Sequence, residues 1–162
     1  MPDHYFITAD HGHIRIFQVS QATGQHEPSL SQVEAMDFPA GRQSYVDRDT
    51  SMAGRFRSSK HQAAGPAGAI PGRAGMSIDE RLPMQREEER RRTRDVADEI
   101  EAFLTARPDA TWDFAGAAAF HRSVVGQLTP QLRQRLRHTI EKDLVNQPND
   151  ELRARYLAVG AF

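Results

Sequence analysis

The sequence contains no cysteine and no long apolar run. The lack of cysteine excludes disulfides, thiolate metal ligands and cysteine nucleophiles, and it is compatible with a reducing cytoplasm. The apolar run at 115–120 is far shorter than the ~20 residues that span a bilayer. The first residues form neither a basic nor an apolar segment, so we expect no signal peptide. These absences predict a cytoplasmic protein that does not enter a membrane.

Motifs of nucleotide and hydrolase chemistry are missing as well. The sequence has no Gly-x-x-x-x-Gly-Lys-Ser/Thr loop and no Gly-x-Gly-x-x-Gly fingerprint. Ser58, Ser59 and His61 lie close together, but no Gly-x-Ser-x-Gly elbow surrounds them. We therefore expect no catalytic residues, no bound cofactor and no enzymatic activity.

Hydrophobic patterning predicts one α/β domain over residues 1–162. Strands are expected at 5–9, 14–19 and 30–38, and a turn centred on Gly12 joins the first two as a hairpin. In the third strand, alternation puts Leu30, Gln32, Glu34 and Met36 on one face. Later elements are expected in this order: a long helix from 77 or 79 to 106, a strand at 111–117, helices at 118–128 and from 130, an extended segment at 138–144, and a helix opening at 148–150. This order predicts a mixed sheet with helices on its faces and is similar to a ribonuclease-H-like core.

Residues 39–81 have little periodicity and are rich in glycine and proline. Within them, 41–75 carries six cationic side chains against two acidic ones. A stretch of this length is usually functional or disordered, so a flexible insertion without a specific role and a basic RNA-binding loop are both open. In the second case, cations contact phosphates and aromatic rings stack on unpaired bases. The candidate residues are Arg42, Tyr45, Arg55, Phe56, Arg57, Lys60 and Arg73.

The long helix after this loop has two different halves. Apolar residues recur at helical spacing in its second half, whereas 85–94 contains no apolar residue. Glutamates at 87 and 88 precede arginines at 91 and 92 by one turn, in the favourable order. The first half is therefore either a solvated face or a contact for a polar partner. Arg86 and Arg90 complete the candidate binding residues.

Two groups of polar residues leave catalytic alternatives open. His11 and His13, with Asp10 adjacent and His4 nearby, could share a metal if both project from one side of a strand. A tight polar turn explains them equally. Three aspartates are expected near strand ends: Asp10, Asp37 and Asp143. Such carboxylates suit two-metal phosphodiester chemistry, and they are also ordinary turn residues. We predict no metal site.

Three stretches together resemble the bacterial host-attachment protein family. They are ITADHGHIRIF at 7–17, FHRS with LTPQLR between 120 and 133, and EKDL with DELRAR between 141 and 155. Their order and spacing cover nearly the whole chain. The family name implies a protein required for attachment to host cells.

The family is in turn similar to the middle domain of archaeal and eukaryotic peptide-chain release factors. There, a glycine-rich loop leads into a long charged helix and reaches the ribosomal peptidyl-transferase centre. The segment 41–75 has the corresponding position, but the Gly-Gly-Gln that a release factor needs is absent from the sequence. The resemblance therefore implies a noncatalytic domain that binds RNA, tRNA or the ribosome. A protein-interaction factor acting indirectly in attachment, or a metal-dependent phosphodiester hydrolase, are the alternatives, and the oligomeric state is open.

Overall fold

Five strands form one mixed sheet in the computed structural model, which describes residues 3–20, 27–38 and 78–160. The strands are β1 (His4–Ala9), β2 (His13–Ser20), β3 (Ser29–Asp37), β4 (Thr111–Ala115) and β5 (Leu136–Ile140). They lie in the order β3-β2-β1-β4-β5. Strand β2 is antiparallel to β1 and β3, whereas β4 is parallel to β1 and β5. The predicted α/β architecture with a mixed sheet is confirmed.

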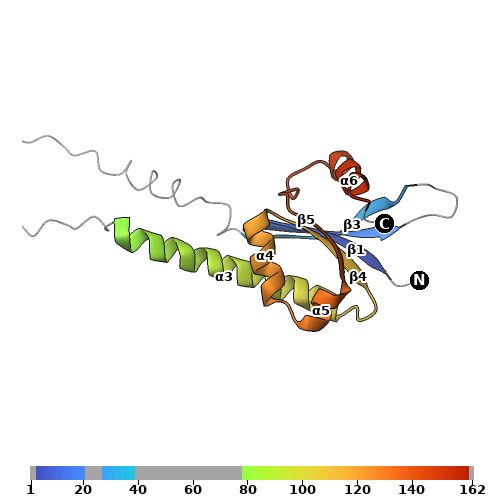
Figure 1. Ribbon diagram of the computed structural model, residues 1–162. Helices are drawn as coiled ribbons and strands as arrows, with labels where there is room; N and C mark the ends of the chain where they lie inside the picture. Colours follow the sequence, from blue (N-terminus) through green and yellow to red (C-terminus); the bar gives the residue numbers. More distant parts are fainter. Residues whose placement is uncertain (1–2, 21–26, 39–77, 161–162) are drawn as a thin grey trace, which may run out of the picture.

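Helices cover both faces of this sheet (Figure 1). The helices are α3 (Ile78–Thr105), α4 (Ala118–Gln127), α5 (Pro130–Arg135) and α6 (Asn149–Ala158). On one face, Ile7 and Phe114 of the sheet belong to a buried cluster with Leu104 of α3. On the other face, Phe6 packs with Tyr156 of α6, with 4.5 Å between ring centroids. Helices α3, α4 and α5 thus share one face, and α6 covers the other.

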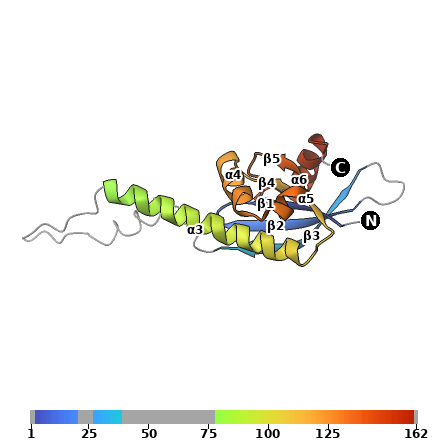
Figure 2. The same ribbon diagram turned by 60° about the horizontal axis from the view of Figure 1, so that its bottom comes forward.

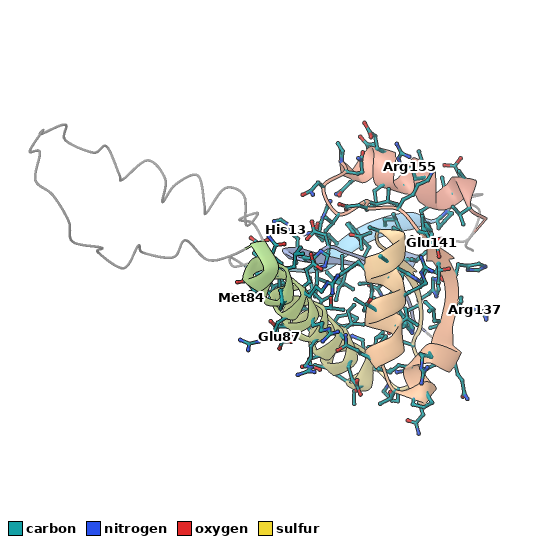
Figure 3. All side chains as sticks on the ribbon, turned by 60° about the vertical axis from the view of Figure 1, so that its left-hand side comes forward. His13, Met84, Glu87, Arg137, Glu141 and Arg155 are labelled. Carbon is teal, nitrogen blue, oxygen red and sulfur yellow. The ribbon has the colours of Figure 1, made fainter. Side chains whose placement is uncertain are left out.

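The two halves of α3 differ in burial, as their composition predicts. Val96, Ile100 and Leu104 in the second half are fully buried. The first half extends past the edge of the sheet (Figures 1 and 2), and Met84 and Glu87 lie on this part of the helix (Figure 3). A polar helical segment outside the core is stabilised by pairs one turn apart and by residues with good helix propensity. This half is therefore available to a polar partner.

Arg135 caps the C-terminal end of α3. Its Nη2 donates to the Leu104 carbonyl at 3.1 Å, and its Nη1 donates to the Arg107 carbonyl at 2.7 Å. The last carbonyls of a helix have no partner within the helix, so the guanidinium replaces the missing donors. This contact joins the end of α3 to the start of β5.

The prediction for the faces of β3 was wrong. Phe17 pairs with Gln32 and Ile16 pairs with Glu34, so Val33 is an extra residue opposite no partner. A bulge of one residue reverses the alternation beyond it. As a result, Leu30 packs on the α6 side of the sheet, whereas Met36 packs on the α3 side.

Two predicted boundaries also shift. The extended segment expected at 138–144 is observed as β5 (Leu136–Ile140), and residues 141–144 are not part of the sheet. The loop assigned to 39–81 lies outside the described residues up to 77, and its last four residues already belong to α3. In the part of the chain that is described, no helix has the length and apolar character needed to cross a membrane.

Arg15 ties the sheet to the segment before α6. Its Nη1 donates to the carbonyls of Val145 and Gln147, at 3.0 and 2.8 Å. Its guanidinium carbon also lies 4.9 Å from the centroid of the Phe17 ring. Burial lowers the pKa of Arg15 from its usual value. An arginine held by backbone carbonyls in this way positions the loop that leads into α6.

Candidate functional site

A cleft of about 620 Å³ opens between the first half of α3, helix α4 and the turn between β1 and β2. Helix α3 contributes Arg86, Glu89, Arg90 and Thr93. These residues are spaced i, i+3, i+4 and i+7, which places them on one face of the helix. The cleft therefore receives two guanidinium groups and one carboxylate from a single helix face.

Arg86 and Arg90 differ from Arg91 and Arg92, which follow them directly on the helix. Arg91 and Arg92 each pair with a glutamate one turn earlier, at 3.4 and 3.3 Å. Within the described residues, neither Arg86 nor Arg90 makes an ion pair or a side-chain hydrogen bond, and both are exposed. The two arginines at the cleft thus keep their donors available.

The sequence contains a signal for this difference. The residue four positions before Arg90 is Arg86, and the one four positions before Arg86 is Leu82. Neither arginine has an acidic residue four positions earlier, which is the spacing at which Glu87 and Glu88 pair with Arg91 and Arg92. Arg94 shares this spacing, since the residue four positions before it is Arg90, but among the three only Arg86 and Arg90 line the cleft.

The turn between β1 and β2 holds His11 at the mouth of the cleft. Asp10 Oδ1 accepts hydrogen bonds from the backbone N–H groups of Gly12 and His13, at 2.6 and 2.7 Å. An aspartate that accepts from the backbone two and three residues later fixes a tight turn. The ring of His11 lies 4.5 Å from that of Phe120 on α4, with 56° between their planes.

Burial is the main cause that lowers the pKa of His11, and the charge of Arg92 adds to it. Glu89 and Asp10 act in the opposite direction. The imidazole is therefore neutral at pH 7. Against Phe120 it forms a flat, uncharged wall beside the two arginines.

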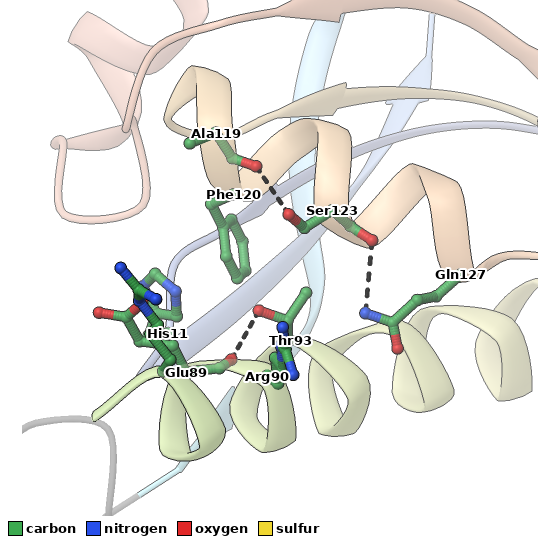
Figure 4. A pocket seen from close by; sticks show the side chains of 9 residues that line it. His11, Glu89, Arg90, Thr93, Ala119, Phe120, Ser123 and Gln127 are labelled. Atoms are coloured by element: carbon green, nitrogen blue, oxygen red, sulfur yellow. Dashed lines mark hydrogen bonds between the residues drawn. The ribbon is translucent and has the colours of Figure 1, made fainter. Parts of the chain in front are cut away.

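Helix α4 supplies hydrogen-bonding groups to the opposite side of the cleft (Figure 4). The Ser123 hydroxyl donates to the Ala119 carbonyl at 3.0 Å, and Gln127 Nε2 donates to the Ser123 carbonyl at 3.3 Å. A hydroxyl that donates once still accepts, and an amide keeps its carbonyl oxygen as an acceptor. The cleft thus combines cations, a flat ring and hydrogen-bonding groups, which suits a ligand that is anionic at one end and planar at the other.

A second polar cluster surrounds Asp113 on the α6 face of the sheet. Its fully buried carboxylate accepts from the Tyr156 hydroxyl at 2.7 Å and from the His138 backbone N–H at 2.9 Å. His4 Nε2 lies 2.8 Å from the same group, and His4 Nδ1 lies 2.7 Å from the Thr111 hydroxyl. The cluster joins β1, β4, β5 and α6. A carboxylate with this many donors has a structural role: it holds these four elements together, and its lone pairs are already occupied.

The same cluster holds the phenol of Tyr156 in its protonated form. Burial raises the pKa of Tyr156 above its usual value of 10, and the hydrogen bond to Asp113 and the charge of that carboxylate add to this. Sequence reasoning did not single out Asp113. The signal was one acidic residue inside an otherwise apolar strand, at the centre of TWDFA.

The structure separates the histidines that were considered as metal ligands. His11 contacts Phe120, whereas His13 Nδ1 lies 3.2 Å from Asp10 Oδ1. His11 lies in the turn before β2 begins at His13, so the alternation of a strand does not apply to the pair. His4 belongs to the distant cluster around Asp113. In the described ranges, no three potential ligands converge as a metal site would require.

The aspartates considered for phosphodiester chemistry have local partners. Asp10 accepts from its own turn, and Asp143 Oδ1 accepts from the Val145 N–H at 3.2 Å. Asp37 Oδ1 lies 3.9 Å from His13 Nε2. Each of these contacts is typical of a carboxylate in a turn or at the end of a strand.

The predicted binding residues fall into two groups. Seven of them lie outside the described residues: Arg42, Tyr45, Arg55, Phe56, Arg57, Lys60 and Arg73. The other two, Arg86 and Arg90, come together at the cleft. The contributions of His11, Phe120 and Gln127 to this cleft were missed, because the cleft forms only when the turn, α3 and α4 are assembled.

Fold and cleft together define a mixed α/β domain with a cleft between two helices that two arginines line. The chain belongs to the family described as "Protein required for attachment to host cells", whose model matches residues 5–155. The resemblance to this family predicted from the sequence is confirmed. No curated protein matches the chain.

Proposed function

We propose that this chain is a noncatalytic RNA-binding domain that contacts tRNA or ribosomal RNA. The contacts are made by the basic 39–81 loop and by the first half of α3. The observation that carries the proposal is that Arg86 and Arg90 line a cleft and make no ion pair within the described residues, whereas the adjacent Arg91 and Arg92 pair with glutamates. Unpaired arginines on an exposed surface are the groups that bind phosphates.

The topology supports a ribonuclease-H-like fold of the kind found in release-factor middle domains. Three strands in a meander, β1 to β3, are followed by α3 and then by two further parallel strands. Strand β2 alone runs against its neighbours. Residues 39–77 precede a long helix that extends past the sheet, which is the arrangement that the release-factor resemblance implies.

A binding role is favoured over catalysis for two reasons. The sequence lacks the Gly-Gly-Gln of release factors. In addition, the carboxylates of Asp10 and Asp143 are engaged with backbone N–H groups of their own turns. The domain would then act by occupying a site on RNA rather than by hydrolysing a bond.

Co-sedimentation with ribosomes and filter binding of tRNA test the proposal. The variant Arg86→Gln/Arg90→Gln removes the two cleft arginines. The matched control Arg91→Gln/Arg94→Gln removes the same charge from positions on α3 that do not line the cleft. We expect the first variant to bind at least tenfold more weakly and the control to stay within about threefold of wild type. Absence of tRNA and ribosome binding by the wild-type chain would refute the proposal.

The family description favours a second candidate, a protein-interaction factor that acts indirectly in attachment. Leu82 and Met84 on α3 are 50% and 45% exposed, although both are apolar. A photo-crosslinking amino acid at position 84, introduced in living cells, distinguishes the candidates because it captures RNA in one case and protein in the other.

Protease treatment of intact cells tests the cytoplasmic location that both candidates assume, since a surface protein would be cleaved.

A further inference from the structure

We infer that the cleft between α3 and α4 holds a single nucleotide unit of the bound RNA, with its phosphate on Arg86 and Arg90 and its base against His11. This inference rests on the proposed RNA-binding function and specifies where one nucleotide is recognised. The cleft volume of about 620 Å³ lies within the range of about 300–1,000 Å³ of small-ligand sites. It is therefore large enough for a base, a ribose and one phosphate.

The phosphate position follows from the two arginines. Arg86 and Arg90 are one helical turn apart, on the side of α3 that lines the cleft. Their planar guanidinium groups match the geometry of phosphate oxygens. With Glu89 between them and His11 neutral, the lining carries an excess of one positive charge. This excess matches the single negative charge of a phosphodiester.

The base position follows from His11. Its partly exposed ring rests on Phe120, which is itself buried, so the imidazole cannot move away from the cleft without losing this contact. Histidine is among the side chains on which unpaired bases stack. The ring is planar, is held at one side by Phe120, and borders the cleft.

Groups that can hydrogen-bond to the edge of a base line the same cleft. Gln127 and Ser123 line the cleft from α4, and Glu89 lines it from α3 (Figure 4). Glutamine, serine and glutamate are side chains that hydrogen-bond to base edges. An inorganic anion or an acidic peptide would use the arginines but would leave the ring and these acceptors without a partner.

Binding of a phosphate in this cleft changes the protonation of His11. The groups that face the imidazole are Glu89 and Arg92 from α3, Asp10 from its own turn, and Asp143 from the segment after β5. A bound anion stabilises the imidazolium and raises the pKa of His11. For each pKa unit of that rise, the form with a protonated His11 binds the anion about ten times more tightly than the form with a neutral His11. Affinity is therefore expected to increase as the pH falls from 8 to 6.

The test uses two probes, adenosine 5′-monophosphate and a single-stranded RNA hexamer, on the full chain labelled with ¹³C in its histidine rings. The His11 signal is assigned by its loss in His11→Phe. We expect both probes to shift this signal and to raise the pKa of His11, and Arg86→Gln/Arg90→Gln to abolish the shift. The Arg91→Gln/Arg94→Gln control should behave as wild type.

Affinity measurements on two His11 variants separate stacking from charge. His11→Ala should bind the hexamer at least about fivefold more weakly, which is the lower end of what stacking one base on an aromatic ring contributes. His11→Phe keeps a flat ring and should bind within about twofold of wild type at pH 8. It should also lose the increase in affinity between pH 8 and pH 6. Circular dichroism shows whether each variant is folded.

The outcomes distinguish this inference from the proposed function. If the hexamer binds but His11 does not shift and His11→Ala binds as wild type does, the nucleotide site is wrong while RNA binding stands. If adenosine monophosphate shifts His11 but tRNA, ribosomes and the hexamer do not bind, the cleft is a nucleotide site and RNA binding is refuted. If a glutamate-rich peptide shifts His11 and neither nucleotide probe does, the inference is overturned in favour of a protein partner.

Discussion

Replacement of Tyr156 by phenylalanine removes one hydroxyl from the buried cluster around Asp113. That hydroxyl donates to Asp113 Oδ2 at 2.7 Å, and both residues are fully buried. A hydrogen bond to a charged group contributes about 1.5–3 kcal/mol. The ring of Tyr156 stays in contact with Phe6 in the variant, so no large cavity forms. We expect Tyr156→Phe to lower the free energy of unfolding by about 2 kcal/mol.

Urea unfolding followed by tryptophan fluorescence measures this loss. Trp112 is the only tryptophan in the chain, it is fully buried, and its indole N–H donates to the Leu132 carbonyl at 2.9 Å. With an m value of about 2 kcal/mol/M, the midpoint should fall by about 1 M. Tyr5→Phe is the matched control, because the Tyr5 hydroxyl makes no hydrogen bond within the described residues. If Tyr156→Phe lowers the free energy of unfolding by less than about 0.5 kcal/mol, or by no more than Tyr5→Phe does, the cluster around Asp113 does not stabilise the fold as we describe.

Three further predictions concern pH and the arginine that positions α6. His121 is buried, its ring nitrogens have no hydrogen-bond partner in the described part of the chain, and burial lowers its pKa from 6.5. The unfolded chain therefore takes up a proton that the folded chain does not, and the free energy of unfolding falls as the pH drops below 6.5. His121→Phe should weaken this fall between pH 8 and pH 5 in urea titrations, and an unchanged slope would contradict the burial argument. The raised pKa of Tyr156 has the opposite direction, since the unfolded chain loses a proton above pH 10 that the folded chain keeps. The stability advantage of wild type over Tyr156→Phe should thus shrink as the pH rises above 10, and a constant difference up to pH 11 would be evidence against it. Arg15→Met removes hydrogen bonds to two backbone carbonyls and should lower the free energy of unfolding by about 2 kcal/mol; a thermal unfolding midpoint equal to that of wild type would exclude this role.

Local signals predicted most of the fold. Helix α3 (Ile78–Thr105) was predicted closely because residue types that often cap helices stand at 77 and 79, and Pro108 follows its last turn. Strands β1 and β2 were predicted because a short apolar run stands before a polar turn and a stretch of alternating apolar residues follows it. The faces of β3 were not predicted, because the bulge at Val33 is a backbone feature that the alternation of side chains does not reveal.

The candidate site was predicted only in part. The charge of the first half of α3 pointed to Arg86 and Arg90, which lie on one helix. The rest of the cleft comes from a turn near residue 11 and from α4, and no local pattern connects these segments. The cluster around Asp113 was missed for the same reason, since Tyr156 and His4 lie 43 and 109 residues from it in the sequence.

The salt dependence of tRNA binding tests the central claim most directly. Affinity for nucleic acid falls with salt in proportion to the number of phosphates that cations neutralise. We expect the wild-type chain to bind tRNA with a clear salt dependence. In Arg86→Gln/Arg90→Gln, the slope of log K against log salt should be smaller by about 0.7–0.9, as expected for the loss of the one phosphate that the two arginines contact together. The Arg91→Gln/Arg94→Gln control should keep the wild-type slope. Equal slopes in all three proteins, or no tRNA binding by wild type, would contradict the account.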